Sequence, residues 1–273
     1  MTGHPRPAFT LLMAVCGSDD SRRFEQAVAS VFANSVLPDA FRLVVDGPVP
    51  APLDHCITEL CGRFPIDMLR LPHHRGLGAA MNAGLAAIET EWVVRADADD
   101  INLPNRFALQ VEAMTDEIDI LSGTIREVDR AGRTVGERHV PITADAIRRQ
   151  MSTRSPFNHP AVAFRKDVVL ACGGYPAIAN KQDYLLFAAL LGNGARARNL
   201  PEVLVESVAD SSLYRRRGGI RYALLEVVVQ RQPVRYGFKG AAAAILHGSA
   251  RAFIFLLPTA LRGWIYRHFL RSR

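Results

Sequence analysis

The chain has few cysteines, and no two of them have the CxxC spacing that is typical of many metal and redox sites. It contains four in 273 residues, and its first residues form a short polar stretch rather than a basic and apolar secretion signal. We therefore expect free thiols and a reducing, cytoplasmic setting. Cys56 and Cys61 lie in an apolar stripe at helical spacing, which favours buried thiols over metal ligands.

Several familiar motifs are also missing. The run Gly76-Leu77-Gly78 would need a further glycine to make a dinucleotide-binding fingerprint, and that position is Met81. The sequence has no Walker lysine motif, no Ser, His and Asp in a hydrolase order, and no zinc-ligand spacing. It also has no internal repeat. With 49% hydrophobic residues, it is long enough for one large globular domain, or one domain and an appendage.

Long apolar runs and evenly spread charge are absent as well. Residues 213–273 contain twelve Lys and Arg residues but a single acid, Glu226. Their apolar stretches, 240–250 and 252–261, are shorter than the roughly 20 residues that a membrane-spanning helix needs. The pattern predicts a basic amphipathic helical tail that lies on an anionic membrane surface, so that the protein is peripheral at the inner face of the cell membrane.

The first half of the chain alternates between strand-like and helix-like segments, which predicts an α/β fold with a mixed, mostly parallel sheet. We expect strands at 9–15, 41–45, 66–71 and 91–96, two further strands within 118–140, and helices at 22–35, 77–89, 104–114, 166–172 and 182–191. Ligands of open parallel sheets bind beyond the carboxyl ends of the strands. Cys16, Asp46, Arg75 and the acidic turn 97–100 all fall there.

The acidic turn has three carboxylates in four positions, Asp97, Asp99 and Asp100. They would repel one another strongly without a compensating cation, and an extended Asp97-Ala98-Asp99 would point two of them the same way. Hard oxygen ligands suit Mg²⁺ or Mn²⁺, and magnesium usually takes only one or two protein carboxylates together with substrate phosphates. The turn therefore predicts a diphosphate ligand as well as a metal. The alternative is that Asp99 or Asp100 caps the helix near Pro104.

The surroundings of this turn resemble glycosyltransferase family 2, whose members have the GT-A fold, and most closely its bacterial exopolysaccharide and amylovoran-type members. The similar segments occur in order along nearly the whole chain: 14–16, 45–48, 75–78 with Asn82 and Gly84, 91–100, 103–107 with Gln110, 157–160 and 214–219. The resemblance implies a Rossmann-like nucleotide-binding half at about 8–115 and an acceptor side at about 116–212, followed by the helical tail 213–273.

The resemblance also implies roles for residues on the donor side. Ala14 and Cys16 would border the uracil, and Asp46 would hydrogen-bond the base. Arg75 and Asn82 would line the nucleotide side of the pocket. Asp97 would reach ribose or metal, and Asp99 would be the principal metal ligand.

On the acceptor side, family members place a catalytic base in a Glu-Asp pair at the start of a helix. Here the pair is Gln182-Asp183, so Asp183 is the predicted base, and the first acid of the pair is replaced by Gln182. The alternative for Asp183 is an acid stabilised by the helix dipole. His159 and Arg216 are further candidate ligands of donor or acceptor, although His159 could merely hydrogen-bond backbone and Arg216 could belong to a solvated basic turn.

These residues predict an inverting transferase that uses a nucleotide sugar, with uridine as the expected base, and a lipid-linked glycan on a polyprenyl diphosphate as acceptor. A sugar nucleotidyltransferase is the second possibility, but it should have a glycine-rich, Arg-containing loop directly after the first strand. A non-catalytic membrane-binding or nucleic-acid-binding module is the third. We expect no nucleic-acid partner, because the positive charge is confined to the tail.

Overall fold

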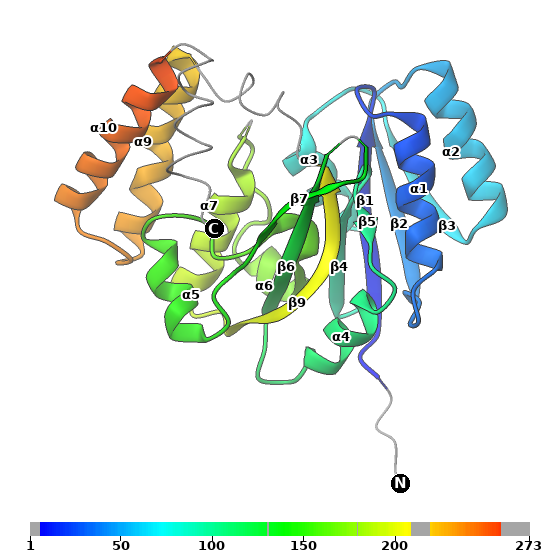
Figure 1. Cartoon of the computed structure of the whole chain (residues 1–273), viewed down its shortest axis with the longest axis horizontal. Helices are drawn as coiled ribbons and strands as arrows, with labels where there is room; N and C mark the ends of the chain where they lie inside the picture. The colour runs from blue at the N-terminus through cyan, green and yellow to red at the C-terminus, as the bar shows by residue number, and fades with distance from the viewer. Residues whose placement is uncertain (1–5, 130, 179, 209–218, 258–273) are drawn as a thin grey trace, which may run out of the picture.

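The computed structural model describes residues 6–129, 131–178, 180–208 and 219–257. A nine-stranded sheet forms its centre, with strand order β3-β2-β1-β4-β8-β6-β9-β5 and β7 paired to β6 (Figure 1). The strands are β1 (Phe9–Cys16), β2 (Ala40–Asp46), β3 (Ile66–Leu71), β4 (Trp92–Asp97), β5 (Ile101–Asn102), β6 (Ile120–Val128), β7 (Thr134–Arg138), β8 (Ala163–Arg165) and β9 (Ala197–Val208). The pairs β1·β2, β2·β3, β1·β4 and β6·β9 are parallel, so the mixed and mostly parallel sheet is confirmed.

Helices cover both faces of this sheet. They are α1 (Ser21–Phe32), α2 (Ala51–Arg63), α3 (Leu77–Leu85), α4 (Arg106–Ala113), α5 (Ala144–Met151), α6 (Lys166–Ala171), α7 (Gln182–Gly192), α9 (Ile220–Arg235) and α10 (Ala241–Leu256), with a short 3-10 turn η1 (His159–Ala161). Successive β1 side chains point to opposite faces: Leu11 and Met13 pack under α1, α2 and α4, whereas Leu12 packs under α3 and α7. Each face therefore has its own apolar core.

Most predicted elements are present, with shifted ends. The helix predicted at 77–89 ends at Leu85, and the one predicted from Pro104 begins at Arg106. The N-cap of α1 is Asp20, whose side chain accepts from the Arg23 N–H. Helix α5, strand β8 and the twelve-residue strand β9 were not predicted.

Two cysteine expectations can be compared with the structure. All four cysteines are free thiols, as expected. Cys56 and Cys61 are half-buried against the core under α1 and α2 rather than fully buried. Burial raises the pKa of both thiols, which suits a packing role.

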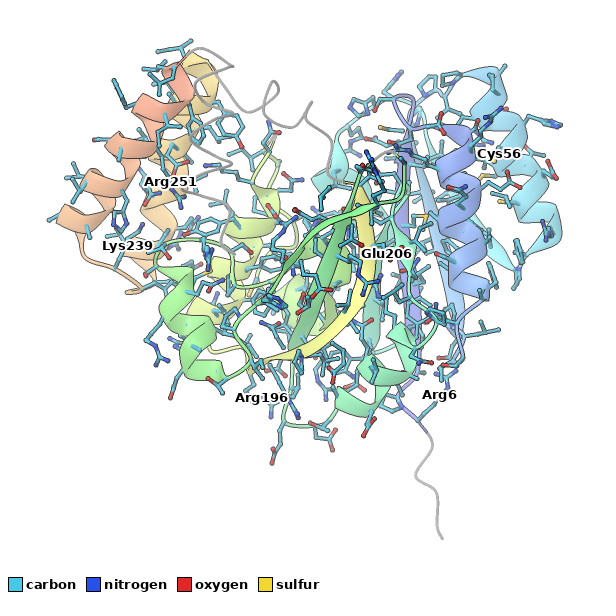
Figure 2. The ribbon with its side chains drawn as sticks, viewed as in Figure 1. Arg6, Cys56, Arg196, Glu206, Lys239 and Arg251 are labelled. Carbon is cyan, nitrogen blue, oxygen red and sulfur yellow. The ribbon has the colours of Figure 1, made fainter. Side chains whose placement is uncertain are left out.

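The tail is helical, as predicted. Helices α9 and α10 pack against each other as a hairpin, and α9 lies against α7 at the left of the molecule in Figure 1. Lys239 and Arg251, labelled in Figure 2, lie on this hairpin. Among the described residues, no helix is long and apolar enough to cross a membrane.

Candidate functional site

The carboxyl ends of β1, β2 and β4 bring four predicted site residues side by side. In the β1·β4 register Ala14 is the partner of Asp97, and in the β1·β2 register Cys16 is the partner of Asp46. Parallel pairing forces these strand ends to the same edge of the sheet. Residues separated by more than 80 positions in sequence therefore line one edge.

Asp46 holds the loop that follows β3. One carboxylate oxygen accepts from the Arg75 N–H at 2.7 Å and the other from the Gly76 N–H at 2.8 Å, and Asp46 is only 3% exposed. The next residue, Gly47, has φ +84°, and a Cβ there would lie 2.4 Å from the His74 backbone nitrogen. Asp46 thus fixes the backbone of Arg75, whose side chain is exposed at the edge.

The acidic turn differs from the extended geometry expected of it. Strand β4 ends at Asp97, and residues 98–99 form a turn, so the prediction that Asp97 and Asp99 project together from an extended segment was wrong. An ion pair within the strand also fixes the first of these acids. Both Nη atoms of Arg95 donate to the two carboxylate oxygens of Asp97. Asp97 is therefore held by a cation of the protein itself.

The other two acids of the turn lie in contrasting surroundings. Asp99 is exposed, whereas Asp100 is 4% exposed. Burial and the neighbouring Asp99 raise the pKa of Asp100 to about 7, although a hydrogen bond from Ser207 and the charges of Arg95 and Arg106 oppose the shift. Neither acid caps α4, because its N-cap is Asn105. The capping alternative is thereby excluded for these two residues.

A carboxylate from outside the turn approaches it from the loop after β1. Asp19 accepts from the Cys16 N–H at 2.8 Å, which closes the loop after the strand. Burial raises the pKa of Asp19, the Cys16 N–H lowers it, and the charge of Asp99 raises it. Asp19 therefore lies near enough to the turn for the charge of Asp99 to act on it.

A buried arginine supports the turn from below. Arg106 is 1% exposed, and it donates to the Arg95 carbonyl, to Asn102 and, at 3.1 Å, to the Gln110 side chain. Burial, together with the charge of Arg95, lowers the pKa of Arg106 to about 9. These contacts tie α4 to β4 and so fix the direction in which the strand enters the turn.

Tyr175 joins the two remaining donor-side candidates. Asn82 donates to the Tyr175 carbonyl and accepts from its N–H, both at 2.8 Å. The Nε2 atom of His159 lies 3.0 Å from the Tyr175 hydroxyl. Burial lowers the pKa of His159 well below its usual value, and the Arg95 charge adds to the effect, so its imidazole is neutral near pH 7. Asn82 and His159 therefore shape the wall of the site through Tyr175.

Asp183 lies half-buried in the first turn of α7, as predicted. Its charge is felt by Tyr175 and by Arg95, the same guanidinium that holds Asp97. Gln182 lies close to Gly78 of α3, and its Oε1 atom is buried without a hydrogen-bond partner in the described part of the chain. The charges of the predicted base and of the acidic turn thus act on one buried cation.

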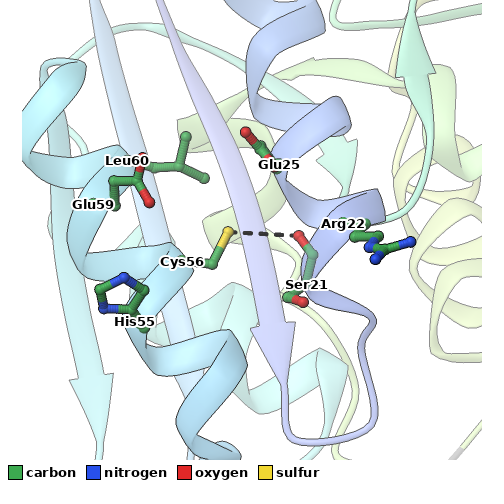
Figure 3. A pocket seen from close by; sticks show the side chains of 7 residues that line it. All are labelled: Ser21, Arg22, Glu25, His55, Cys56, Glu59 and Leu60. Atoms are coloured by element: carbon green, nitrogen blue, oxygen red, sulfur yellow. Dashed lines mark hydrogen bonds between the residues drawn. The ribbon is translucent and has the colours of Figure 1, made fainter.

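One predicted site residue, Arg216, lies outside the described residues. Two hollows occur elsewhere: one of 110 Å³ lies between α1 and α2 and is bordered by Cys56 (Figure 3), and one of 410 Å³ lies near the amino ends of β1 to β3. Neither contains a predicted site residue.

The residues of the turn fit a metal that the ligand brings with it better than a metal held by the protein alone. Within the described ranges, no three His, Cys, Asp or Glu side chains are placed to hold a metal ion. Asp97 is occupied by Arg95, and Asp99 remains exposed. One carboxylate with the remaining ligands from phosphate and water is an arrangement that Mg²⁺ commonly takes.

Some residues of the site were missed in the sequence. Tyr175 was not singled out, although it follows the Gly173-Gly174 pair whose positive φ angles, 88° and 74°, turn the chain towards Asn82. Arg95 was noted only as a neighbour of the acids. No local pattern distinguishes an arginine that pairs two residues further along its own strand from one that points to solvent.

Comparison with known proteins relates this arrangement to sugar transfer. Residues 13–174 match the model of the family described as glycosyl transferase family 2. The UDP-Gal:alpha-D-GlcNAc-diphosphoundecaprenol beta-1,3-galactosyltransferase of Escherichia coli is 35% identical over 97% of both chains. The amylovoran biosynthesis glycosyltransferase AmsE of Erwinia amylovora is 31% identical over 94% of this chain and 97% of its own.

The fold has counterparts among solved structures. The mannosyltransferase PcManGT from Pyrobaculum calidifontis, in complex with GDP-Man and Mn²⁺, superposes with a TM-score of 0.65 at 18% identity. The match covers 98% of this chain and 77% of that one. The GT-A architecture expected from the sequence is confirmed.

Proposed function

Because this chain belongs to glycosyl transferase family 2 and is a glycosyltransferase, we propose that it moves a sugar from a UDP-sugar to a lipid-linked glycan acceptor with inversion at the anomeric carbon. The uridine donor and a polyprenyl-diphosphate acceptor are supported by the name of the Escherichia coli relative, which is similar over nearly its whole length. Both relatives that we describe are glycosyltransferases, and one is named for the synthesis of a polysaccharide.

One observation supports the chemical part of this proposal above the others. The buried Arg95 guanidinium pairs with Asp97 and lies within electrostatic reach of both Asp99 and Asp183. An acid that can receive a proton and an acid that can hold a diphosphate-bound cation therefore lie near the same buried guanidinium. A displacement at a sugar carbon needs both, on opposite sides of the reacting atom.

In the proposed reaction the donor lies along the ends of β1, β2 and β4. Ala14 and Cys16 border the base, Asp46 positions the loop that carries Arg75, and Asn82 and His159 form the wall beside Tyr175. Asp183 accepts the proton of an acceptor hydroxyl while that oxygen attacks the anomeric carbon. The bond from this carbon to the diphosphate breaks, and UDP leaves. A well-placed base of this kind contributes about 10²–10⁴-fold to the rate.

We assign Asp99 as the protein ligand of Mg²⁺ or Mn²⁺, with Asp97, held by Arg95, beside it for the ribose. When bound, the cation would offset the negative charge that gathers on the leaving diphosphate. The Mn²⁺ in the complex of the similarly folded mannosyltransferase is consistent with this assignment.

The proposed place of work is the inner face of the membrane, where a lipid-linked acceptor would be reached. Of the thirteen large apolar side chains that are exposed in the described residues, eight lie on the α9–α10 hairpin: Ile220, Leu224, Val227, Val228, Ile245, Leu246, Phe253 and Leu256. Arg231 and Arg235 are exposed on the same hairpin. Apolar side chains beside basic ones are typical of helices that lie in the interface of an anionic bilayer.

The decisive test is release of nucleoside diphosphate from a panel of UDP-sugars and GDP-sugars with a synthetic sugar-diphospho-lipid acceptor, with and without Mn²⁺. We expect turnover with a UDP-sugar that stops on chelation, and a product of inverted anomeric configuration by NMR. Asp183→Asn should reduce kcat by about 10²–10⁴-fold. Asp145, an exposed acid in the first turn of α5, provides the matched control, because it shares the helix position and lies outside the site.

The controls separate the base from a helix-dipole acid. If Asp183 served only the helix dipole, Asp183→Asn and Asp145→Asn would have equally small effects on kcat. Absence of turnover with any donor in the presence of acceptor and metal would refute the proposed function as a whole.

A further inference from the structure

The only acid of the basic tail is buried against the catalytic half of the molecule. Glu226 of α9 is 0% exposed, and its carboxylate pairs with the Nζ atom of Lys181. Lys181 immediately precedes Gln182 and Asp183 at the start of α7. The single acid of residues 213–273 thus forms its ion pair with the segment that carries the proposed base.

Further groups complete the surroundings of this ion pair. Gln230 donates to Glu226 Oε1 at 2.5 Å, and Arg251 of α10 lies 3.4 Å from the same oxygen. The Nζ atom of Lys181 also lies 5.3 Å from the ring centroids of Tyr222 and Phe255. Burial alone would raise the pKa of Glu226, but Lys181 and the other donors outweigh it, and the pKa is lowered. Glu226 is therefore ionised in the folded protein.

The backbone beside the pair is in an uncommon conformation. Asn180 and Lys181 have φ angles of 71° and 58°, and they are the only non-glycine residues with positive φ in the described chain. Left-handed conformations of non-glycine residues persist where surrounding contacts fix them, and they gather at functional sites. Two such residues in succession lead into α7, and the Lys181–Glu226 pair is a contact at the second of them.

We propose that Glu226 is a positioning residue: through Lys181 it anchors the first turn of α7, so that the docked α9–α10 hairpin sets the orientation of Asp183. The inference rests on the proposed role of Asp183 as base. It makes the tail part of the catalytic apparatus as well as a membrane-facing surface. Loss of the anchor is expected to reduce kcat without changing the KM for the nucleotide sugar, whose site lies on β1, β2 and β4.

The test uses the full chain with Lys181→Met and Glu226→Gln combined. Removing both charges avoids leaving one of them buried and unpaired, so the double variant should remain folded. We expect its kcat to fall by about tenfold to a hundredfold, since small displacements of catalytic groups have effects of that size. The KM for the nucleotide sugar should stay within about twofold, and Glu226→Gln alone should lower kcat by a similar factor.

The control is Asp119→Asn, which breaks the ion pair of the buried Asp119 with Arg196, whose side chain is 52% exposed, at the amino end of β9, the lower edge of the sheet in Figure 2. This variant should leave kcat unchanged. A kcat of the double variant equal to the native value would overturn the proposal. A loss matched by Asp119→Asn would do the same, since it would reflect general destabilisation.

A second measurement needs no substrate and so separates this inference from the proposed function. Amide hydrogen exchange of residues 182–187 should accelerate at least tenfold in the double variant, while that of residues 120–128 stays native. Unchanged exchange at 182–187 would refute the anchor even in an active enzyme. Faster exchange in a chain that turns over no donor would refute the proposed function but retain the anchor.

Discussion

Arg95 and Asp97 form a two-pronged ion pair along one strand, with both guanidinium Nη atoms on the two carboxylate oxygens. Arg95 is 2% exposed and Asp97 28% exposed. The planar fork of an arginine fixes a carboxylate in one orientation, which a lysine cannot do. The two acids at the ends of the 97–99 motif therefore differ: one is held by the protein, and the other is exposed to a ligand.

This difference predicts that two similar substitutions change different properties: one the stability of the fold, the other the metal requirement. Asp97→Asn leaves a buried guanidinium without its counter-charge, so the free energy of unfolding should fall by about 1–3 kcal/mol, discounted for the partial exposure of Asp97. Asp99→Asn should change the free energy of unfolding by less than about 0.5 kcal/mol. It should, however, raise the Mn²⁺ concentration that gives half-maximal activity by at least about tenfold.

Urea unfolding and Mn²⁺ titration of activity, carried out on both variants, check this prediction. Equal losses of stability would contradict the view that Arg95 binds only the first acid. An unchanged metal requirement in Asp99→Asn would remove the assignment of Asp99 as the protein ligand.

The strand ends of the donor side could be predicted from sequence because each depends on local pattern. Apolar runs of strand length end in Cys16, Asp46 and Asp97, and parallel pairing brings these strand ends to the same edge of the sheet. The position of Asp183 at the start of a helix could be predicted in the same way. Nothing in these segments required knowledge of distant partners.

The remaining features depend on contacts between distant segments, and the sequence pattern did not reveal them. Asn82 meets Tyr175 across 93 positions, and Lys181 meets Glu226 across 45. A turn at 98–99 replaced the expected extension, and no periodicity encodes the pairing of Arg95 with Asp97. Strand β9 was missed for a related reason: Pro201 interrupts its sequence, and the register with β6 shifts nearby, between Gly123 and Ile125.

The Asn82 contact predicts a stability loss with a defined control. Asn82→Ala removes two hydrogen bonds to the Tyr175 backbone and leaves a half-buried N–H and carbonyl unpaired, which should reduce the free energy of unfolding by about 2 kcal/mol. Asn193→Ala removes a similar 2.8 Å bond to the Ala189 carbonyl on an exposed helix end, and should cost less than about 0.5 kcal/mol. Equal losses in urea unfolding would show that Asn82 does not brace Tyr175.

His159 predicts how stability depends on pH. Its pKa in the folded protein lies well below 6.5, whereas the unfolded chain has an ordinary imidazole. Between these two values the unfolded state binds more protons, so stability is fully present above pH 6.5 and is lost as the pH falls below it. The contribution of this residue has a limiting slope of about 1.4 kcal/mol per pH unit.

The measurement is urea unfolding between pH 5 and 8 for the native chain and for His159→Gln, which does not titrate. The native chain should lose more stability on acidification than the variant. His55→Gln, at an exposed position of α2, should leave the native slope in place. If His159→Gln does not reduce the dependence of the unfolding free energy on pH, other groups determine the loss of stability at acidic pH.

The exposed face of the hairpin predicts membrane binding that combines apolar and electrostatic parts. Ile245 and Leu246 are 71% and 69% exposed, so glutamate at either position should leave the fold intact. Each substitution removes an apolar side chain from the interface and adds a charge that anionic lipid repels, so partition to phosphatidylglycerol vesicles should fall at least about tenfold. Leu37→Glu, at an apolar position that is 45% exposed and lies outside the hairpin, should leave vesicle binding unchanged. Equal binding of all three variants in co-sedimentation at low salt would remove the hairpin as the membrane-facing surface.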